Sequence, residues 1–320
     1  MKILTDEKSA GKRIDKVLSS YAKVTADKKE GVFFNGGISR VEIADYIKEG
    51  KVLVNGKTIK PSYILKEGDQ IEITFDLEKN VIVSPNPNLK IRIIHEDDDI
   101  IIIDKPAGIR SHVDLQDQEN TLVNFLVARY PEIASIHDGS EGSWMRPGIV
   151  HRLDMDTSGI MVVARNEKTL RELKRKFQDK EIEKKYWALA IGRFEEKEGI
   201  IEKPLARSSS YRKQVIATKR TKTKIREAIT HYKVIQEFDG YALLEVSPKT
   251  GRMHQIRVHL ASIGHPIIGD EKYLPKNMES GISRAASRHL LHAKSIRFSL
   301  FGRDYFFDSA ISDDFRVFLD

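Results

Sequence analysis

The chain has 320 residues, 40% of them hydrophobic, and a formal net charge of +7 that coexists with 47 acidic residues. This length and composition allow a buried core in two domains, or in one large domain that carries a small one, and the basic excess favours an anionic partner. The absence of cysteine excludes disulfides, thiolate metal sites and cysteine nucleophiles. No apolar run is long enough to cross a bilayer and the start lacks an apolar signal core, so we expect a cytoplasmic protein without membrane contact.

The first 75 residues predict two helices followed by a small β unit. Apolar residues at helical spacing over 14–21 indicate the first helix, and Ser39 with Glu42 forms a capping box that starts the second. The dipeptide Asn55-Gly56 predicts a tight hairpin, because both residue types tolerate positive backbone angles. The segment IEITF then predicts a further strand.

The stretch from Gly11 to Phe75, particularly SRVEIADYIKEGKVLVNGKTIKPSYILKEGD, resembles the S4 RNA-binding domain. In that family the paired helices present basic residues to structured RNA, which implies RNA contacts for Arg40, Lys48 and Lys51. The alternative is that these side chains only solvate two helices.

The segment VSPNPNLK, residues 83–90, is rich in proline and asparagine and cannot sustain a helix or a central strand, so we interpret it as a linker. It divides the chain into domains of residues 1–82 and 91–320. In the second domain, β-like runs alternate irregularly with helical patterns, which predicts an α+β fold with a mixed or antiparallel sheet. The predicted strands are Ile91 to Ile94, Ile100 to Ile103, Ile160 to Ala164, Tyr186 to Ile191 and Tyr241 to Val246, and the predicted helices are Thr121 to Arg129, Lys168 to Gln178 and Arg252 to Ile263.

The densest group of chemically active residues is RPGIVHRLDMDTSGIMVVARN, residues 146–166, where a polar loop runs into an apolar strand. A scaffold can hold charged groups rigidly at such a strand entrance. The spacing also imitates the start of a calcium loop, but Arg165 stands where that loop needs a bidentate glutamate. The histidines of the chain lack HExxH spacing and are interleaved with arginines, so we expect no metal site. Taken alone, Asp154 could also serve only as a turn cap.

A second group, KTGRMHQIRVHLASIGHPIIGDEKY, covers residues 249–273. At helical spacing its apolar residues form one face, and Arg257 lies on the flank of that face. An arginine near a core needs an anion. We therefore predict an ion pair between Arg257 and Asp154, with the guanidinium fork holding the carboxylate ionised and oriented.

Together these stretches resemble the RluA-type family of pseudouridine synthases, in particular its S4-bearing, RluC- and RluD-like members. The signature HRLDxxTSG begins at His151, the tyrosine motif appears as KKYWALA, and the third motif as GRMHQIRVHL followed by GHPIIGD. The resemblance implies that Asp154 is the catalytic aspartate, that Arg152 enters the RNA where the base leaves, that Tyr186 packs against the uracil, and that Arg257 is the partner of Asp154. His151, Arg252 and His254 are expected to be structural members of these motifs.

The resemblance implies an isomerase that converts specific uridines of RNA to pseudouridine. This reaction is redox-neutral, which agrees with a chain that lacks a dinucleotide-binding glycine loop and a P-loop, so no cofactor is expected. The basic run over residues 205–228 predicts a loop or hairpin in which Arg212 and Lys213 contact RNA, unless it is only solvated.

The expected substrate is large-subunit ribosomal RNA, with transfer RNA second, and a monomer without an obligate protein partner is the default. The rivals are a non-catalytic S4-type RNA-binding protein and a hydrolytic nucleosidase, which would need a second carboxylate such as Asp156. The departures from the family pattern at 113–120 and 137–145 have no assigned role.

Overall fold

The computed structural model describes residues 2–7, 9–21, 40–74, 83–114, 117–140, 142–208, 213–278 and 281–319. The chain separates into two compact units. The N-terminal unit runs to Ser84 and includes Val113–Gln118 and Gly139–Met145, and the C-terminal unit comprises Pro85–His112, Glu119–Asp138 and Arg146–Asp320. The division falls inside the predicted linker, and the backbone N–H of Asn86 donates a hydrogen bond to the carbonyl of Asn124, 3.0 Å away, within the C-terminal unit.

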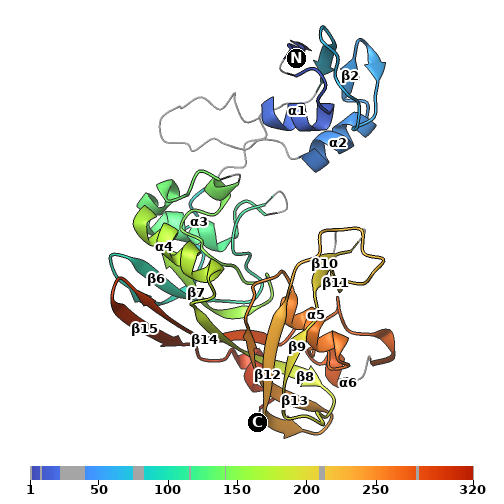
Figure 1. The fold of residues 1–320 in the computed structure, drawn as a ribbon. Helices are drawn as coiled ribbons and strands as arrows, with labels where there is room; N and C mark the ends of the chain where they lie inside the picture. The colour runs from blue at the N-terminus through green and yellow to red at the C-terminus, as the bar shows by residue number, and fades with distance from the viewer. Residues whose placement is uncertain are drawn as a thin grey trace. The chain divides into compact units, whose positions relative to one another are not determined.

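The described residues of the N-terminal unit form the helices α1 and α2 (Figure 1). They also form a four-stranded antiparallel sheet in the order β1-β4-β2-β3. Both predicted helices are present, and their apolar residues, with those of the strands, form one buried core. The capping side chains predicted at Ser39 and Glu42 lie outside the described part of the chain. The elements are β1 (Lys2–Leu4), α1 (Ile14–Tyr21), α2 (Arg40–Lys48), β2 (Val52–Val54), β3 (Lys57–Thr58) and β4 (Gln70–Ile73).

The hairpin between β2 and β3 has the geometry that its sequence predicts. Asn55 and Gly56 have φ angles of 51° and 73°, as a type I′ turn requires. The Asn55 side chain also donates to Asp69, 2.8 Å away, and accepts from the backbone of Gln70 at 2.9 Å. These bonds join the turn to the start of β4.

The C-terminal unit is built on a nine-stranded mixed sheet with the order β5-β6-β7-β14-β8-β13-β12-β9, and β15 also pairs with β14. This confirms the predicted α+β class. The strands are β5 (Arg92–Glu96), β6 (Ile100–Lys105), β7 (Ser158–Ala164), β8 (Glu183–Ile191), β9 (Glu198–Glu202), β12 (Ile229–Phe238), β13 (Tyr241–Pro248), β14 (Leu291–Leu300) and β15 (Arg303–Asp308), with a separate hairpin of β10 (Leu205–Arg207) and β11 (Gln214–Ile216).

The helices of this unit are α3 (Leu122–Arg129), α4 (Glu167–Gln178), α5 (Gln255–Ser262), α6 (Gly281–Arg284) and α7 (Asp313–Arg316). The prediction that the third motif is helical from Arg252 was wrong by three residues. His254 has a left-handed φ of 54°, which ends any continuous helix on its N-terminal side.

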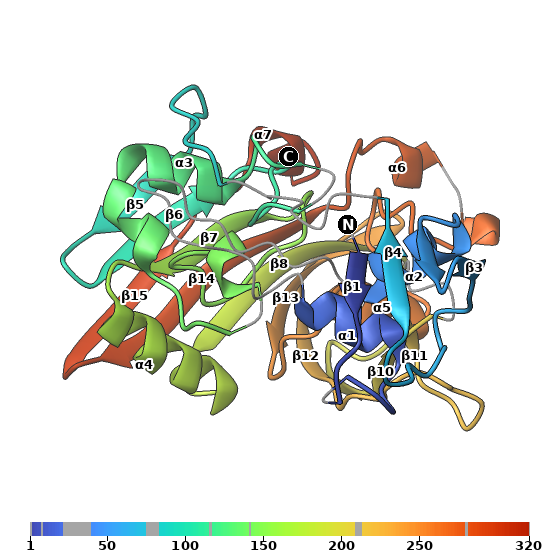
Figure 2. The same ribbon diagram turned by 90° about the horizontal axis from the view of Figure 1, so that it is seen from above.

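The strand β7 lies at the centre of the sheet between β6 and β14, and its pairing with β14 is the parallel one among the described strand pairs (Figure 2). All seven residues of β7 are buried, which shows that both faces are covered there. Gly159 permits the close approach to β14, because a Cβ at this position would lie 2.3 Å from the carbonyl oxygen of Ala293. The loop that enters β7 is thereby placed beside the start of β14.

Candidate active site

A buried lysine holds the loop that enters β7 in place. Lys105, at the end of β6, is fully buried, and its ammonium donates three hydrogen bonds of 2.8 to 2.9 Å to the carbonyls of Pro106, Ile109 and Met155. Burial lowers the pKa of Lys105 to about 7. Ser111 adds a hydrogen bond from its hydroxyl to the carbonyl of Leu153 at 2.9 Å. The backbone on both sides of Asp154 is therefore tied to the segment after β6.

The loop is also joined to the residues that precede β14. The Thr157 hydroxyl and Nε2 of His289 lie 2.8 Å apart, and the guanidinium of Arg288 donates to the carbonyl of Asp156 at 2.9 Å. Arg288 is itself held by two hydrogen bonds to Asp314 on α7, 2.6 and 3.0 Å long. Three separate parts of the C-terminal unit thus position this loop.

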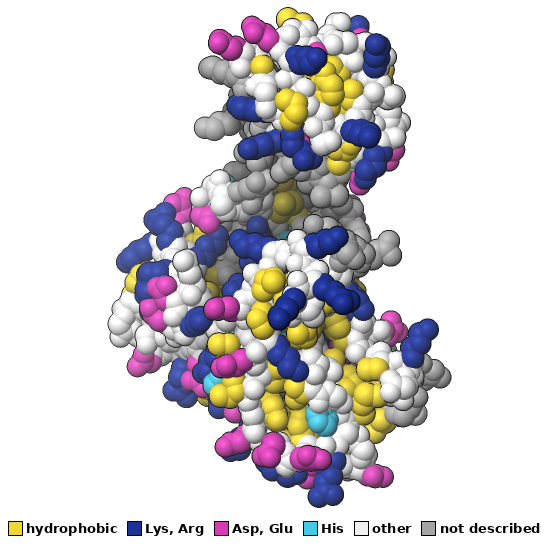
Figure 3. All heavy atoms as spheres, turned by 45° about the vertical axis from the view of Figure 1, so that its right-hand side comes forward, with side chains coloured by type: hydrophobic (Ala, Val, Ile, Leu, Met, Phe, Trp, Pro, Cys, Tyr) yellow, Lys and Arg dark blue, Asp and Glu magenta, His cyan; other side chains and the backbone are white. Residues whose placement is uncertain are grey.

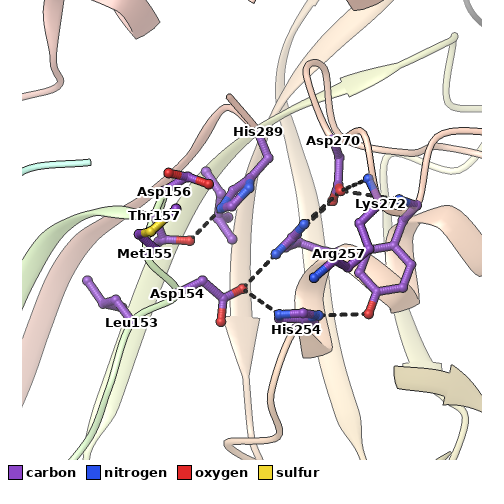
Figure 4. A network of polar contacts seen from close by, with 12 residues as sticks. Leu153, Asp154, Met155, Asp156, Thr157, His254, Arg257, Asp270, Lys272 and His289 are labelled. Carbon is purple, nitrogen blue, oxygen red and sulfur yellow. Dashed lines mark hydrogen bonds and ion pairs between the residues drawn. The ribbon is translucent and has the colours of Figure 1, made fainter. Parts of the chain in front are cut away.

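The predicted ion pair between Asp154 and Arg257 is present (Figure 4). Nη1 of Arg257 donates to Oδ2 of Asp154 at 3.0 Å. The guanidinium fork, however, is used by another carboxylate: Nε and Nη2 donate to the two oxygens of Asp270 at 2.7 and 2.8 Å. Asp270 has no exposed surface, whereas 17% of the Asp154 side chain is exposed. Arg257 is therefore anchored by the buried aspartate and directs its remaining nitrogen to the accessible one.

This geometry keeps Asp154 ionised. Burial alone would raise the pKa of Asp154, but neighbouring positive charge and the hydrogen bond from Arg257 outweigh it and lower the pKa. His254 lies 3.9 Å from the same carboxylate oxygen, but burial lowers its pKa to about 4, so the imidazole is neutral at pH 7. The stabilising charge at neutral pH is therefore that of Arg257.

His254 is held in its left-handed conformation by a hydrogen-bond chain. The Tyr273 hydroxyl accepts the backbone N–H of Gln214 at 3.0 Å and lies 2.8 Å from Nδ1 of His254. Because the phenol already accepts that N–H, we assign its proton to the bond with Nδ1, which leaves Nε2–H facing Asp154. The β10–β11 hairpin is thereby connected to the surroundings of Asp154.

Tyr186, on β8, and His151, in the signature itself, are two further partly buried members of these motifs. Burial, with a contribution from the charge of Asp154, raises the pKa of Tyr186, so this phenol is protonated near the carboxylate. His151 accepts the backbone N–H of Val162 with Nε2 at 3.0 Å and stacks on Phe177, with ring centroids 4.6 Å apart. Burial lowers the pKa of His151 to about 3, so this ring is neutral at pH 7.

The signature holds two further charged residues, Arg152 and Asp156, and their surroundings differ from those of Asp154. Arg152 is exposed, and its Nη1 lies 3.5 Å from Nε2 of His112. The carboxylate of Asp156 has no hydrogen bond or ion pair with any described residue. In the third motif, Arg252 donates from Nε to the carbonyl of Glu227 at 3.0 Å, which ties the motif to the end of the basic run.

The residues predicted to contact RNA lie on both units. In the N-terminal unit, Lys48 pairs with Asp45 and Lys51 pairs with Glu49, each at 2.7 Å, while the side chain of Arg40 lies outside the described residues. In the C-terminal unit, Lys213 is exposed at the start of β11, and Arg212 lies outside the described residues.

Two further classes of site are absent from the described ranges. No group of three or more His, Cys, Asp or Glu residues there could hold a metal ion. No helix among these residues is both long and apolar enough to span a membrane.

Sequence reasoning missed Asp270, Lys105 and Tyr273. Asp270 had a signal, because it belongs to the GHPIIGD segment and the argument that a buried arginine needs an anion applies to it as well as to Asp154. Lys105 had none, since a lysine after a strand normally predicts an exposed side chain.

A family model described as RNA pseudouridylate synthase matches residues 99–262, and the model of the S4 domain matches residues 35–71. An uncharacterized RNA pseudouridine synthase of Aquifex aeolicus is 42% identical over 73% of this chain and 72% of that protein. A protein of Borreliella burgdorferi named ribosomal large subunit pseudouridine synthase D is 38% identical over 76% of this chain and 72% of its own length.

Two solved human structures have a similar fold. RNA Pseudouridylate Synthase Domain Containing 1 has a TM-score of 0.57 and 22% identity, and covers 71% of this chain and 86% of that chain. RNA Pseudouridylate Synthase Domain Containing 4 has a TM-score of 0.53 and 25% identity, and covers 70% of this chain and 90% of that chain. The family-model match and the sequence identities together show that the chain belongs to the RNA pseudouridine synthases, which are isomerases that act on RNA, and that it carries an S4 domain.

Proposed function

We propose that this enzyme isomerises uridines in large-subunit ribosomal RNA and that Asp154 is its catalytic carboxylate. The names of several relatives support the substrate, among them the Borreliella burgdorferi protein and one of Pasteurella multocida that is 35% identical over 81% of this chain. The ion pair of Asp154 with the buried Arg257 is the observation that carries the catalytic assignment.

The chemistry requires an ionised and accessible carboxylate. Cleaving the bond between uracil and ribose develops positive charge on the sugar, and an aspartate can stabilise that charge, attack C1′, or remove a sugar proton. Asp154 meets the common requirement of these routes, because its pKa is lowered and part of its side chain is exposed. A two-carboxylate hydrolase would need Asp156 as its second catalytic carboxylate. Asp156 has no ion pair with any described residue that would hold it in place, and this favours an enzyme with the single catalytic carboxylate Asp154.

We assign base extrusion to Arg152 and stacking to Tyr186. A uracil inside folded RNA is out of reach, and extruding it costs roughly a few kcal/mol. Arg152 is exposed two residues before Asp154, where it can occupy the space that the base leaves. Tyr186 offers a flat ring near Asp154, and stacking on an aromatic ring contributes about 1 to 3 kcal/mol for a base.

We assign RNA contacts to the segment over residues 205–228. It carries exposed basic residues that form no ion pair with the described residues, and basic side chains gather on this part of the C-terminal unit (Figure 3). Unpaired cations release counterions when they bind phosphates. The exposed basic residues described in this segment are Arg207, Lys213, Lys219, Arg220, Lys222, Lys224 and Arg226. We assign a second RNA contact to the S4 helices through Arg40, Lys48 and Lys51.

We further propose that the enzyme works in the cytoplasm as a monomer, because one chain contributes every residue of the network of Asp154, Arg257 and Asp270. Chemical mapping of pseudouridine in total RNA, from cells with and without this protein, tests the substrate. We expect one or a few large-subunit rRNA positions to lose pseudouridine. Loss confined to transfer RNA would contradict the proposal.

A further inference from the structure

Lys184, on β8, is a partly buried cation without a carboxylate partner among the described residues. Its ammonium forms no hydrogen bond or ion pair with these residues, and it lies over the face of Phe177, 5.4 Å from the ring centroid. Burial alone lowers the pKa of Lys184 to about 8, and no carboxylate contributes to the shift. A lysine that loses hydration without gaining an anion destabilises its charged form.

The position of Lys184 is set by the alternation of β8. Side chains two residues apart point to the same face of a strand and lie roughly 7 Å apart, so Lys184 shares its face with Tyr186. The charge of Asp154 contributes to the raised pKa of Tyr186, and the charge of Lys184 contributes to the lowered pKa of His151. Lys184 therefore lies at the edge of the group formed by Asp154, Tyr186 and His151.

The neighbouring residue provides a comparison within the same strand. Lys185 points to the opposite face, where it lines a hollow of about 440 Å³ together with Trp187. There it pairs with Glu245 at 3.1 Å. Of these two consecutive lysines, Lys185 is paired with a carboxylate, and Lys184, beside the proposed active site, is not paired with any described residue.

We propose that Lys184 binds a backbone phosphate of the RNA beside the extruded uridine. The enzyme acts on a polyanion, and a phosphate supplies both the negative charge and the acceptor oxygens that Lys184 lacks. The ring of Phe177 faces the ammonium at 5.4 Å and limits its positions. The role is one of binding and positioning, and it rests on the proposed active site at Asp154.

The test compares RNA affinity over a range of KCl concentrations for the full-length protein and for Lys184→Met, Lys184→Arg and Lys185→Met. The probes are large-subunit rRNA transcribed in vitro without modification and, in parallel, total tRNA. Methionine keeps an unbranched apolar side chain of similar length and removes the charge. We expect Lys184→Met to raise Kd about 5- to 10-fold and to reduce the slope of log Kd against log salt by about 0.7 to 0.9. Lys184→Arg should recover most of the affinity, and Lys185→Met should stay within about 2-fold of the parent.

An unchanged salt slope in Lys184→Met, or an equal change in Lys185→Met, would overturn the proposal. A second measurement uses the unaltered protein, so that it does not depend on the folding of a variant: limited amine acetylation followed by mass spectrometry. RNA should protect Lys184 and leave Lys185 reactive, and equal protection of both, or of neither, would contradict the inference. Because binding is measured without turnover, an error in the catalytic role of Asp154 would appear in the activity of Asp154→Asn and not in these slopes.

Discussion

Arg257 binds Asp270 through two nitrogens, at 2.7 and 2.8 Å, and reaches Asp154 through the third, at 3.0 Å. The Asp270 pair is the more buried of the two, since 0% of the Asp270 side chain is exposed. Asp270 thus determines where Arg257 points, and Arg257 determines the ionisation of Asp154. A residue far from the substrate in this chain of contacts can control activity.

The first prediction concerns Asp270→Asn. The amide would turn its NH₂ group toward a guanidinium donor and leave Arg257 without its buried counter-ion, and breaking such a pair costs about 3 to 5 kcal/mol. We expect a lower free energy of unfolding in urea and a large fall in pseudouridine formation. Asp313→Asn is the control, because Asp313 faces Arg316 on the surface with 99% of its side chain exposed. Parental stability and activity in Asp270→Asn would show that Asp270 does not anchor Arg257.

The sequence was informative where local periodicity determines position. Helical spacing placed Arg257 near the core, and the polar loop before an apolar strand placed Asp154 at a strand entrance. The sequence could not show that the guanidinium fork of Arg257 binds Asp270. Asp270 follows Arg257 by 13 residues, through a turn whose path depends on tertiary packing. The burial of Lys105 depends equally on three carbonyls that only the folded loops bring together. The sequence pattern indicated the elements and the Arg257–Asp154 pair, whereas the partners of Asp270 and Lys105 required the fold.

The second prediction concerns pH and stability. Burial lowers the folded-state pKa of four histidines from 6.5 to about 3 or 4, so between those values the unfolded chain binds more protons than the folded one. The free energy of unfolding is therefore highest above pH 6.5 and falls as the pH drops toward 4. The loss at pH 5 is on the order of 1 to 2 kcal/mol for each histidine. Urea unfolding at pH 7 and pH 5 measures it. The residues are His151, His254, His289 and His292.

A variant isolates one of these contributions. His151→Gln removes the titrating ring, and the amide oxygen can still accept the N–H of Val162. We expect this variant to be less stable than the parent at pH 7 and to lose less stability between pH 7 and pH 5. An unchanged difference between the two pH values would mean that the folded-state pKa of His151 is not lowered.

The third prediction is that removing residues 1–82 weakens RNA binding and flattens its salt dependence, while residues 83–320 remain folded. The N-terminal unit has its own buried core, and phosphate contacts by its basic helices would release counterions. Circular dichroism checks the fold, and binding over a range of salt concentrations checks the contact. A salt slope equal to that of the full chain would leave the S4 domain without the proposed role.

The fourth prediction is that Arg152→Ala keeps the fold but loses activity mainly on structured RNA. Arg152 is exposed, so its removal leaves the packing of the loop intact. Its proposed task is to support the gap left by an extruded base, which matters only where the base was stacked or paired. Rates on a folded rRNA fragment and on an unstructured oligonucleotide make the comparison. Equal losses on both would argue against base extrusion by Arg152.

The fifth prediction is that Asp154→Asn abolishes pseudouridine formation and leaves RNA affinity within a few-fold of the parent. The change is nearly isosteric, but an amide cannot act as an anion, and loss of a catalytic nucleophile typically lowers the rate by about 10⁴ or more. Binding should survive because phosphate contacts elsewhere supply most of the affinity. Tritium release from labelled uridine in RNA measures the rate, and Asp156→Asn is the matched control.

The Asp154→Asn variant also tests whether Asp154 and Asp270 share the guanidinium of Arg257. Combining Asp154→Asn with Arg257→Gln would restore stability if Arg257 served Asp154 alone. Because Arg257 also neutralises Asp270, the double variant leaves a fully buried carboxylate without its cation, and we expect it to be less stable than Asp154→Asn by about 3 kcal/mol or more. Recovery of stability in the double variant would contradict this network. Near-parental activity in Asp154→Asn, or an indispensable Asp156, would remove Asp154 as the catalytic carboxylate.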